Sequence, residues 1–513
     1  MRAVADLPAR THLLRASRQL APAWVLALPT LLLCAVALRI VAGTLGRENF
    51  WLDELSSLYF SDPARSIYDT VREIWRGETN PPLYYVYLYL WRHIVPGADE
   101  ASIRAASLIP AALACASPLF YPSRVMSFER RLAVVLLLSF SPGLLYYAGE
   151  ARGYGLALFF SVNMCFLTLS ALQTLRADSG GLVSQLGLLG VFSAAAAWTH
   201  LFGTLLAAVF FLILVAASVL LRRRILTVAL AAVLTGAAVT IWPLAHLAYM
   251  NAVAGDHWFI SLSRESVMSE TKWIGHLAFG HRLSVLAFGG LTVAALAFAW
   301  RPLRSGKTAF YLSLPLLVGL VLGLSIGIPI YYGRYFMVAL PVIYILVAEA
   351  VGDAAQRAGA PEWLSFAVLL VLSPLLMSEW PVLQPPERED WRAPANVVNA
   401  MPSCAGAPIF VLSPGRDTGD PAYLYRHYLD RALDVDLVPI LAGERFAPGA
   451  LARVWRSPCP VKVWGSHVEL WQLRALDSQF AGFPSGFSLR PFRGGFLLLA
   501  GGAEQVAGGS PGR

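Results

Sequence analysis

Residues 202–224 read FGTLLAAVFFLILVAASVLLRRR, an uncharged apolar run that ends in three consecutive arginines. As a helix, a run of this length crosses the hydrocarbon core of a bilayer, which is about 30 Å thick. Similar runs, separated by short loops that carry arginine, recur from Ala23 to about Leu376. The sequence therefore predicts a polytopic α-helical membrane protein.

The composition of the chain supports this prediction. Hydrophobic residues make up 57% of the 513 residues and charged residues 14%, and the mean hydropathy is +0.58. A soluble domain carries about 25% charged residues. A large soluble helical protein would also need polar faces on most of its helices, and they are missing here. The net charge of +8 comes mainly from arginines, many of them in predicted cytoplasmic loops. We therefore expect contact with anionic membrane lipids and no nucleic-acid partner.

We expect about eleven spans. They lie at 22–43, 104–120, 131–148, 153–173, 183–199, 202–221, 225–248, 284–300, 308–329, 335–351 and 361–379. The first apolar run is longer than the 7–15 residues of a secretory signal, so we interpret it as an uncleaved anchor with a cytoplasmic N-terminus.

The Tyr-rich run 82–95, PLYYVYLYLWRHIV, decides which loops face outward. It is short for a span and suits a helix in the membrane interface. If it does not cross, Arg222–Arg224 and the other well-charged loops lie in the cytoplasm, as the positive-inside rule requires. Segments 44–103 and 249–283 and the tail then lie outside. The predicted domains are a transmembrane domain at 1–380 and a soluble α/β domain at 381–513, which lies in the periplasm or its equivalent compartment.

The tail has the composition of a small α/β domain. Segments 409–413, 461–465 and 496–500 are predicted strands, and 420–433 is a predicted helix. Cys404 and Cys459 are the two cysteines of this part. They would pair in an oxidising compartment or stay as free buried thiols, and the sequence leaves both alternatives open.

The first outer segment carries two adjacent carboxylates in ENFWLDELS, residues 48–56. Acidic residues at a membrane boundary tend to be functional, and a carboxylate against an apolar wall gains the basicity of a general base. An ordinary solvated pair is the alternative for Asp53 and Glu54 taken alone.

Three further motifs fall on the same predicted side of the membrane. They are TNPPLYY at 79–85, EARGY at 150–154 and YYGRY at 331–335. An arginine at the interface can bind a phosphate through paired hydrogen bonds. Each arginine taken alone is more simply interpreted as an anchor to the lipid headgroups. Acids and arginines together indicate a lipid-phosphate substrate attacked by a nucleophile that must lose a proton.

These motifs resemble, in the same order, those of the GT-C glycosyltransferases. The resemblance is strongest to the bacterial branch of the protein O-mannosyltransferase and lipid A aminoarabinose transferase superfamily, and it includes EDWR at 389–392. It implies a GT-C membrane domain in a bacterial inner membrane, with interfacial helices in its first outer loop and a periplasmic C-terminal domain. It also implies an enzyme that moves a sugar from a polyprenyl-phosphate donor to a lipid, glycan or protein acceptor on the outer face, with inversion.

The resemblance also assigns roles to residues. Asp53 would be the general base, and Glu54 and Glu150 would assist it or hold a divalent metal ion. Arg152 and Arg334 would bind the donor phosphate and stabilise the leaving group. Tyr84, Tyr154 and Tyr335 would line the sugar or lipid groove. Asn80 stands where many members have histidine, so the resemblance leaves a metal cofactor undecided. His200, in an outer turn, is either a site residue or a structural one.

Two rival functions follow from the same features. A transporter or flippase of lipid-linked sugars would have its binding site near the middle of the membrane, between repeated halves, whereas the acids here cluster at one face. A ligase that joins whole lipid-linked glycans to an acceptor would have the same type of fold, so the fold does not separate it from a glycosyltransferase. The outer segment 249–283 contains histidines without a firm metal-binding spacing, so we expect an amphipathic flap there instead of a zinc site.

Overall fold

The protein is represented by a computed structural model that describes residues 27–28, 30–95, 97, 99–257, 262–280, 284–299, 306–328, 330–377, 389–412, 420–440, 448–466 and 487–500. The chain divides into two compact units. We call Met1–Leu45, Ile103–Ala248 and Trp258–Gln384 the helical unit, and Gly46–Ser102, Tyr249–His257 and Pro385–Arg513 the mixed unit. The mixed unit thus joins the first outer segment to the tail.

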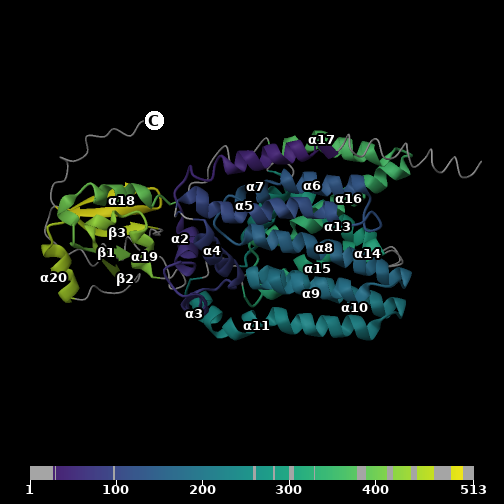
Figure 1. Cartoon of the computed structure of the whole chain (residues 1–513), viewed down its shortest axis with the longest axis horizontal. Helices are drawn as coiled ribbons and strands as arrows, with labels where there is room; N and C mark the ends of the chain where they lie inside the picture. Colours follow the sequence, from purple (N-terminus) through teal and green to yellow (C-terminus); the bar gives the residue numbers. More distant parts are fainter. Residues whose placement is uncertain are drawn as a thin grey trace, which may run out of the picture. The chain divides into compact units, whose positions relative to one another are not determined.

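The helical unit consists of α-helices and short 3₁₀ helices (Figure 1). The first three residues of α5 and the last nine of α11 belong to the mixed unit. They are α5 (Glu100–Ala116), η1 (Ser117–Phe120), α6 (Phe128–Ser139), α7 (Pro142–Tyr147), α8 (Tyr154–Ala177), α9 (Leu182–Thr199), α10 (Leu201–Leu221), α11 (Ile225–His257), α12 (Arg264–Phe279), α13 (Ser284–Ala299), α14 (Gly306–Tyr311), α15 (Ser313–Ser325), η2 (Gly333–Ala339), α16 (Leu340–Arg357) and α17 (Glu362–Met377).

Six helices among the described residues are long and apolar enough to cross a membrane. They are Glu100–Phe120, Tyr154–Ala177, Leu182–Thr199, Leu201–Leu221, Ile225–His246 and Gly333–Arg357, and each coincides with a predicted span. Thr30–Ala42, Ala309–Ser325 and Glu362–Val371 are shorter apolar helices within other predicted spans. The chain is therefore a multi-pass membrane protein, as predicted, and the total of eleven spans stays a prediction.

One predicted span, 131–148, is interrupted in the structure. Helix α6 ends at Ser139 and α7 begins at Pro142. The Ser141 hydroxyl accepts a hydrogen bond from the N–H of Leu144 and caps α7. Proline has no N–H to donate and is well tolerated in the first turn of a helix. The apolar run thus contains a helix start that hydropathy does not show.

Helices α8, α9 and α10 pack side by side (Figure 1). The turn between α9 and α10 is tight, because a side-chain carbon at Gly203 would lie 2.4 Å from the backbone carbon of Ala196. Glycine at 203 therefore allows α10 to begin directly at Leu201. His200 caps α10, and its Nδ1 accepts from the N–H of Phe202 over 3.2 Å.

The first outer segment forms three helices of the mixed unit, α2 (Leu52–Phe60), α3 (Ile67–Gly77) and α4 (Leu83–Ile94). Helix α4 has 12 residues, which makes it about 18 Å long. It is too short to cross a bilayer, as the sequence indicated. Helix α3 exposes a stripe of apolar side chains at Ile67, Val71 and Trp75, the pattern of an interfacial helix.

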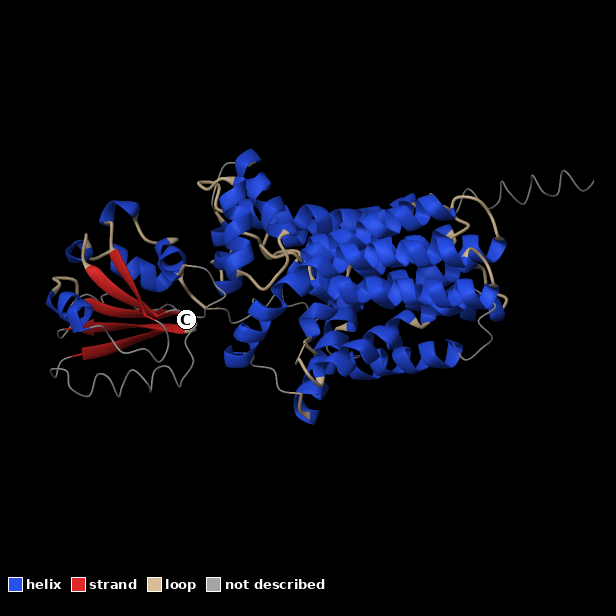
Figure 2. Cartoon of the chain, turned by 90° about the horizontal axis from the view of Figure 1, so that it is seen from below, coloured by secondary structure: helices blue, strands red, loops and turns tan. Residues whose placement is uncertain are grey.

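The tail forms a five-stranded mixed sheet in the order β2-β1-β3-β5-β4 (Figure 2). The strands are β1 (Pro408–Leu412), β2 (Asp436–Ile440), β3 (Val461–Ser466), β4 (Phe487–Phe492) and β5 (Gly495–Ala500). β1 pairs in parallel with β2 and β3, and β5 pairs antiparallel with β3 and β4. The three predicted strands are confirmed as β1, β3 and β5.

Alternating side chains of the strands meet different helices. Phe410 and Val463 share a core with Val454 of α20 (Pro448–Arg456). Trp464 instead packs edge-on against Tyr425 of α19 (Pro421–Arg426). The remaining elements are α18 (Arg392–Asn399), η3 (Pro402–Cys404) and η4 (Arg431–Leu433).

Two features of the tail add to or differ from what the sequence predicts. Cys404 and Cys459 form a disulfide, which decides between the two alternatives. The predicted helix 420–433 is shorter than expected, because α19 ends at Arg426 and Asp430 begins η4 by accepting a hydrogen bond from the N–H of Ala432. Aspartate favours such caps over helix interiors.

Candidate functional site

Asp53 and Glu54 lie in the first turn of α2 in the mixed unit. Glu54 is fully buried, and its Oε2 accepts from the backbone N–H of Trp51 over 3.4 Å. Asp53 is half-buried. The N-terminus of a helix stabilises negative charge. Glu54 thus helps to start the helix, and Asp53 is the more accessible acid.

A third carboxylate, which the sequence analysis did not single out, holds the TNPPLYY motif in place. Glu78 is 3% exposed. Its Oε1 accepts from the N–H and Nδ2 of Asn80 over 2.8 and 2.9 Å, and its Oε2 accepts from the hydroxyl of Tyr85 over 2.7 Å. Tyr84 is buried, with its ring 6.0 Å from that of Tyr85. Asn80 therefore anchors the turn before α4.

The residues before α2 are joined to the tail within the mixed unit. The hydroxyl of Tyr428 accepts from the N–H of Phe50 over 2.6 Å and donates to Glu100 Oε1 over 2.7 Å. Arg392 forms an ion pair with the same carboxylate. The ring of His427 lies 5.3 Å from that of Phe50. We call these five residues the α2 anchor.

The EARGY motif forms a tight turn between α7 and α8 in the helical unit. Glu150 is 1% exposed, and its carbonyl accepts from the N–H of Arg152 over 2.8 Å. The carbonyl of Arg152 accepts from the hydroxyl of Ser107 on α5 over 3.1 Å. A side-chain carbon at Gly155 would lie 2.4 Å from the carbonyl oxygen of Ser107, so glycine allows α8 to approach α5 this closely.

Arg334 and Tyr335 lie on η2, which α12 holds. The Arg334 guanidinium lies 4.7 Å from the centre of the Tyr332 ring, a cation–π contact. Glu270 Oε2 on α12 accepts from the N–H of Gly333 over 2.6 Å. A side-chain carbon at Gly333 would lie 2.6 Å from Cδ1 of Trp273. Glycine therefore lets η2 pack directly against α12.

Aromatic rings connect the two motifs of the helical unit. The His200 ring lies 5.7 Å from the ring of Tyr154 and 5.1 Å from that of Tyr335. The charges of Arg152 and Arg334 both act on His200. Glu150 and both arginines also lie close enough to Tyr154 to act on its hydroxyl. We call this group the Arg–Tyr cluster: Glu150, Arg152, Tyr154, His200, Arg334 and Tyr335.

Burial, reinforced by the charges of two arginines, keeps His200 neutral. Burial lowers the pKa of His200 to about 3, and the charges of Arg152 and Arg334 act in the same direction. Because Nδ1 accepts from Phe202, the neutral ring carries its proton on Nε2. Burial raises the pKa of Glu270, against the effects of the Gly333 N–H and of Arg334. The cluster thus has two permanent cations and a histidine that does not compete with them.

The structure brings together the six predicted site residues that lie in the helical unit. Asp53, Glu54, Asn80 and Tyr84 lie in the mixed unit. The sequence analysis missed Glu78, Glu270 and Trp273, and their positions directly before TNPPLYY and inside the predicted flap were the available signals. Across the described residues, no group of three or more His, Cys, Asp or Glu side chains is arranged to hold a metal ion. Of the histidines in the predicted flap 249–283, His281 lies outside the described residues.

No protein-family model matches the sequence, and no curated protein matches it significantly. Solved structures do. ArnT from Cupriavidus metallidurans in the apo state superposes with a TM-score of 0.58 at 15% identity, over 94% of this chain and 98% of that one. The chain has the fold of ArnT. ArnT bound to undecaprenyl phosphate gives 0.55 at 13% identity, over 92% and 98%.

The apo oligosaccharyltransferase from Archaeoglobus fulgidus gives a TM-score of 0.46 at 13% identity, over 93% of this chain and 75% of that one. We draw no conclusion from a similarity this low. The ArnT-like fold agrees with the fold that the resemblance implies. Membership of the GT-C superfamily, and of its bacterial branch, stays a prediction.

Proposed function

We propose that the chain is an inverting glycosyltransferase. It moves a sugar from a polyprenyl-phosphate donor to a lipid, glycan or protein acceptor on the periplasmic face. The observation that carries this proposal is the Arg–Tyr cluster at one end of a helical unit with the fold of ArnT, a protein whose structure has also been solved with undecaprenyl phosphate. Two arginines held among aromatic rings suit a phosphate that enters from a lipid environment.

The course of the helices supports the proposed side of the membrane. Helix α8 begins at Tyr154 and α10 begins at Leu201, beside the Arg–Tyr cluster. At the opposite end, α10 is followed directly by Arg222–Arg224. The positive-inside rule assigns the three arginines to the cytoplasm. The cluster then belongs to the outer face, as do the first outer segment and the tail in a chain of about eleven spans.

The proposed reaction follows the roles that the resemblance gives to the predicted site residues. The acceptor oxygen or nitrogen attacks the anomeric carbon from the side opposite the phosphate. The bond between that carbon and the phosphate oxygen breaks, and polyprenyl phosphate leaves with the electron pair. Asp53 takes the proton of the acceptor, and Glu54 supports it. Arg152 and Arg334 compensate the negative charge that grows on the leaving phosphate, which is where positioned cations lower a barrier most.

A complemented deletion strain tests the proposal whichever sugar is transferred. Mass spectrometry of envelope glycolipids and glycoproteins should show one sugar increment lost in the deletion and restored by the wild-type gene. Arg334→Ala should lower the transfer rate by about 10²–10³-fold. Arg264→Ala is the matched control, because Arg264 is an exposed arginine at the start of α12. Full restoration by Arg334→Ala would remove this arginine from the site.

An assay of the purified protein in detergent solution separates a transferase from a flippase. A transferase releases polyprenyl phosphate and forms a glycosylated acceptor in detergent solution, where there is no membrane to cross. A flippase forms no product there. A glycan ligase would add a whole oligosaccharide mass instead of a single sugar.

A further inference from the structure

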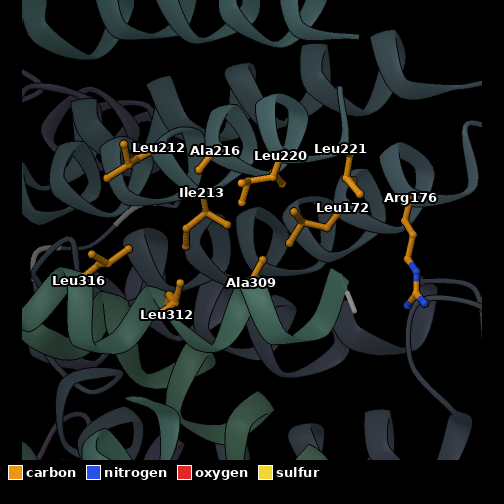
Figure 3. Close-up of a pocket in the computed structure, with 11 residues that line it drawn as sticks. Leu172, Arg176, Leu212, Ile213, Ala216, Leu220, Leu221, Ala309, Leu312 and Leu316 are labelled. Atoms are coloured by element: carbon orange, nitrogen blue, oxygen red, sulfur yellow. The ribbon is translucent and has the colours of Figure 1, made fainter. Parts of the chain in front are cut away.

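An apolar pocket lies at the ends of α8 and α10 that are remote from the Arg–Tyr cluster (Figure 3). It has a volume of about 220 Å³. Apart from Arg176, only aliphatic side chains line it, and they come from α8, α10, α14 and α15. Apolar cavities of about 150 Å³ stay dry and bind small hydrocarbons. This space is therefore suited to hydrocarbon and not to water.

Small residues create the space. Ala216 and Ala217 of α10 and Ala309 of α14 stand where larger side chains would fill the gap between the helices. Ala216 is exposed, so the pocket is open to the surroundings of the bundle. In a membrane those surroundings are acyl chains.

The polar end of the pocket is basic. Arg176 is exposed in the last turn of α8, and Figure 3 shows its guanidinium at one end of the pocket-lining residues. Arg223 donates to the carbonyls of Leu175 and Arg176, which keeps its charge beside this end of α8. Arg222, which follows α10 directly, is also exposed. One acid beside this end of α8, Asp178, pairs with Arg224 over 3.6 Å.

We propose that this pocket binds one acyl chain of an anionic phospholipid of the cytoplasmic leaflet, with the phosphate at Arg176. The charge of the pocket end complements a phosphate, and an arginine can bind one through two hydrogen bonds. The 23 residues from Tyr154 to Arg176 span about 34 Å of helix. The lipid phosphate is therefore separated from the Arg–Tyr cluster by about one bilayer core, so this site is distinct from the donor site.

Native mass spectrometry of the purified, delipidated protein tests the proposal. Dioleoyl phosphatidylglycerol and dioleoyl phosphatidylcholine are added in equal amounts, and retained lipid is measured. The wild type should prefer the anionic lipid. Arg176→Gln should lower that preference about five-fold, the effect of one basic residue at a lipid surface. Arg357→Gln at the end of α16 is the control, since Arg357 is exposed and does not line the pocket.

A second variant tests the acyl chain. Ala216→Phe fills the pocket and should abolish retention of both lipids at this site, while Ala208→Phe on the same helix, exposed but outside the pocket, should not. Wild-type retention in Ala216→Phe would overturn the assignment. Displacement of the phospholipid by equimolar polyprenyl phosphate would also overturn it, because the occupant would then be the tail of the donor. Neither result depends on the proposed reaction.

Discussion

The Glu270 carboxylate accepts a hydrogen bond from the backbone N–H of Gly333 over 2.6 Å. This bond fixes the start of η2, the 3₁₀ helix that carries Arg334, against α12. Gly333 is buried, so its N–H would be unpaired without this acceptor. Glu270 is thus a positioning residue that acts on the site through the backbone.

Substitutions at Glu270 should separate the effect of its hydrogen-bond acceptor from the effect of its negative charge. Glu270→Gln keeps an acceptor for Gly333 and removes the negative charge near Arg334. We expect wild-type thermal stability and unchanged or tighter donor binding. Glu270→Leu removes the acceptor as well and should destabilise the fold by about 1–3 kcal/mol, with a lower kcat. Thermal unfolding and steady-state kinetics measure both. Glu265→Gln on the exposed first turn of α12 is the control, and equal behaviour of the Gln and Leu variants would contradict the positioning role.

The α2 anchor predicts that the tail controls the acids of the first outer segment. Tyr428→Phe leaves the ring in place but removes the acceptor of the Phe50 N–H and a donor to Glu100. Loss of such a buried partner costs about 1–3 kcal/mol. We therefore expect kcat to fall while the KM for the donor changes little, because the donor phosphate is assigned to the helical unit.

The control for this prediction is Tyr68→Phe. Tyr68 belongs to the same unit and is 73% exposed, so loss of its hydroxyl should change neither stability nor rate. If Tyr428→Phe and Tyr68→Phe have the same kcat as the wild type, the anchor does not act on the reaction.

Local patterns in the sequence predicted much of this architecture. The apolar runs predict α8, α9 and α10 to within a few residues, and the β-type runs predict β1, β3 and β5. Such patterns could not predict the α2 anchor. Phe50 and Tyr428 are 378 positions apart, and hydrophobic periodicity carries information only about neighbours along one element.

The candidate site was likewise predicted only in part. The motifs indicated Glu150, Arg152, Tyr154, Arg334 and Tyr335, because their residue types suit a phosphate and their loops share a predicted side. The one signal for Glu270 was its place in the predicted flap, and a single glutamate in an amphipathic helix is most simply interpreted as solvated. Its role depends on Gly333, whose missing side chain lets η2 approach Trp273. That packing is a tertiary effect.

Asp53→Asn should lower the transfer rate by about 10²–10⁴-fold, the usual contribution of a general base, and leave folding unchanged. Glu54→Gln can still accept from Trp51 and should have a smaller effect. Asp62→Asn is the matched control. Asp62 is half-buried like Asp53, and an asparagine there can still accept from the N–H of Ala64. Rates are measured as polyprenyl phosphate released, and a fully active Asp53→Asn would remove this residue as the base.

The neutral state of His200 predicts how stability depends on pH. Burial lowers its pKa to about 3 in the folded protein, against about 6.5 for an exposed histidine. Between these values the unfolded chain binds the proton and the folded protein does not. Stability is therefore lost as pH falls from about 6.5 towards 3.

His200→Asn tests whether stability falls with pH for this reason, because asparagine can still cap α10 but does not titrate. The melting temperature of the wild type should fall more steeply below pH 6.5 than that of the variant. His427, whose pKa burial lowers to about 4, contributes to both curves, so their difference isolates His200. Parallel curves would show that His200 is protonated in the folded protein and lies in a more solvated place than the ring contacts with Tyr154 and Tyr335 describe.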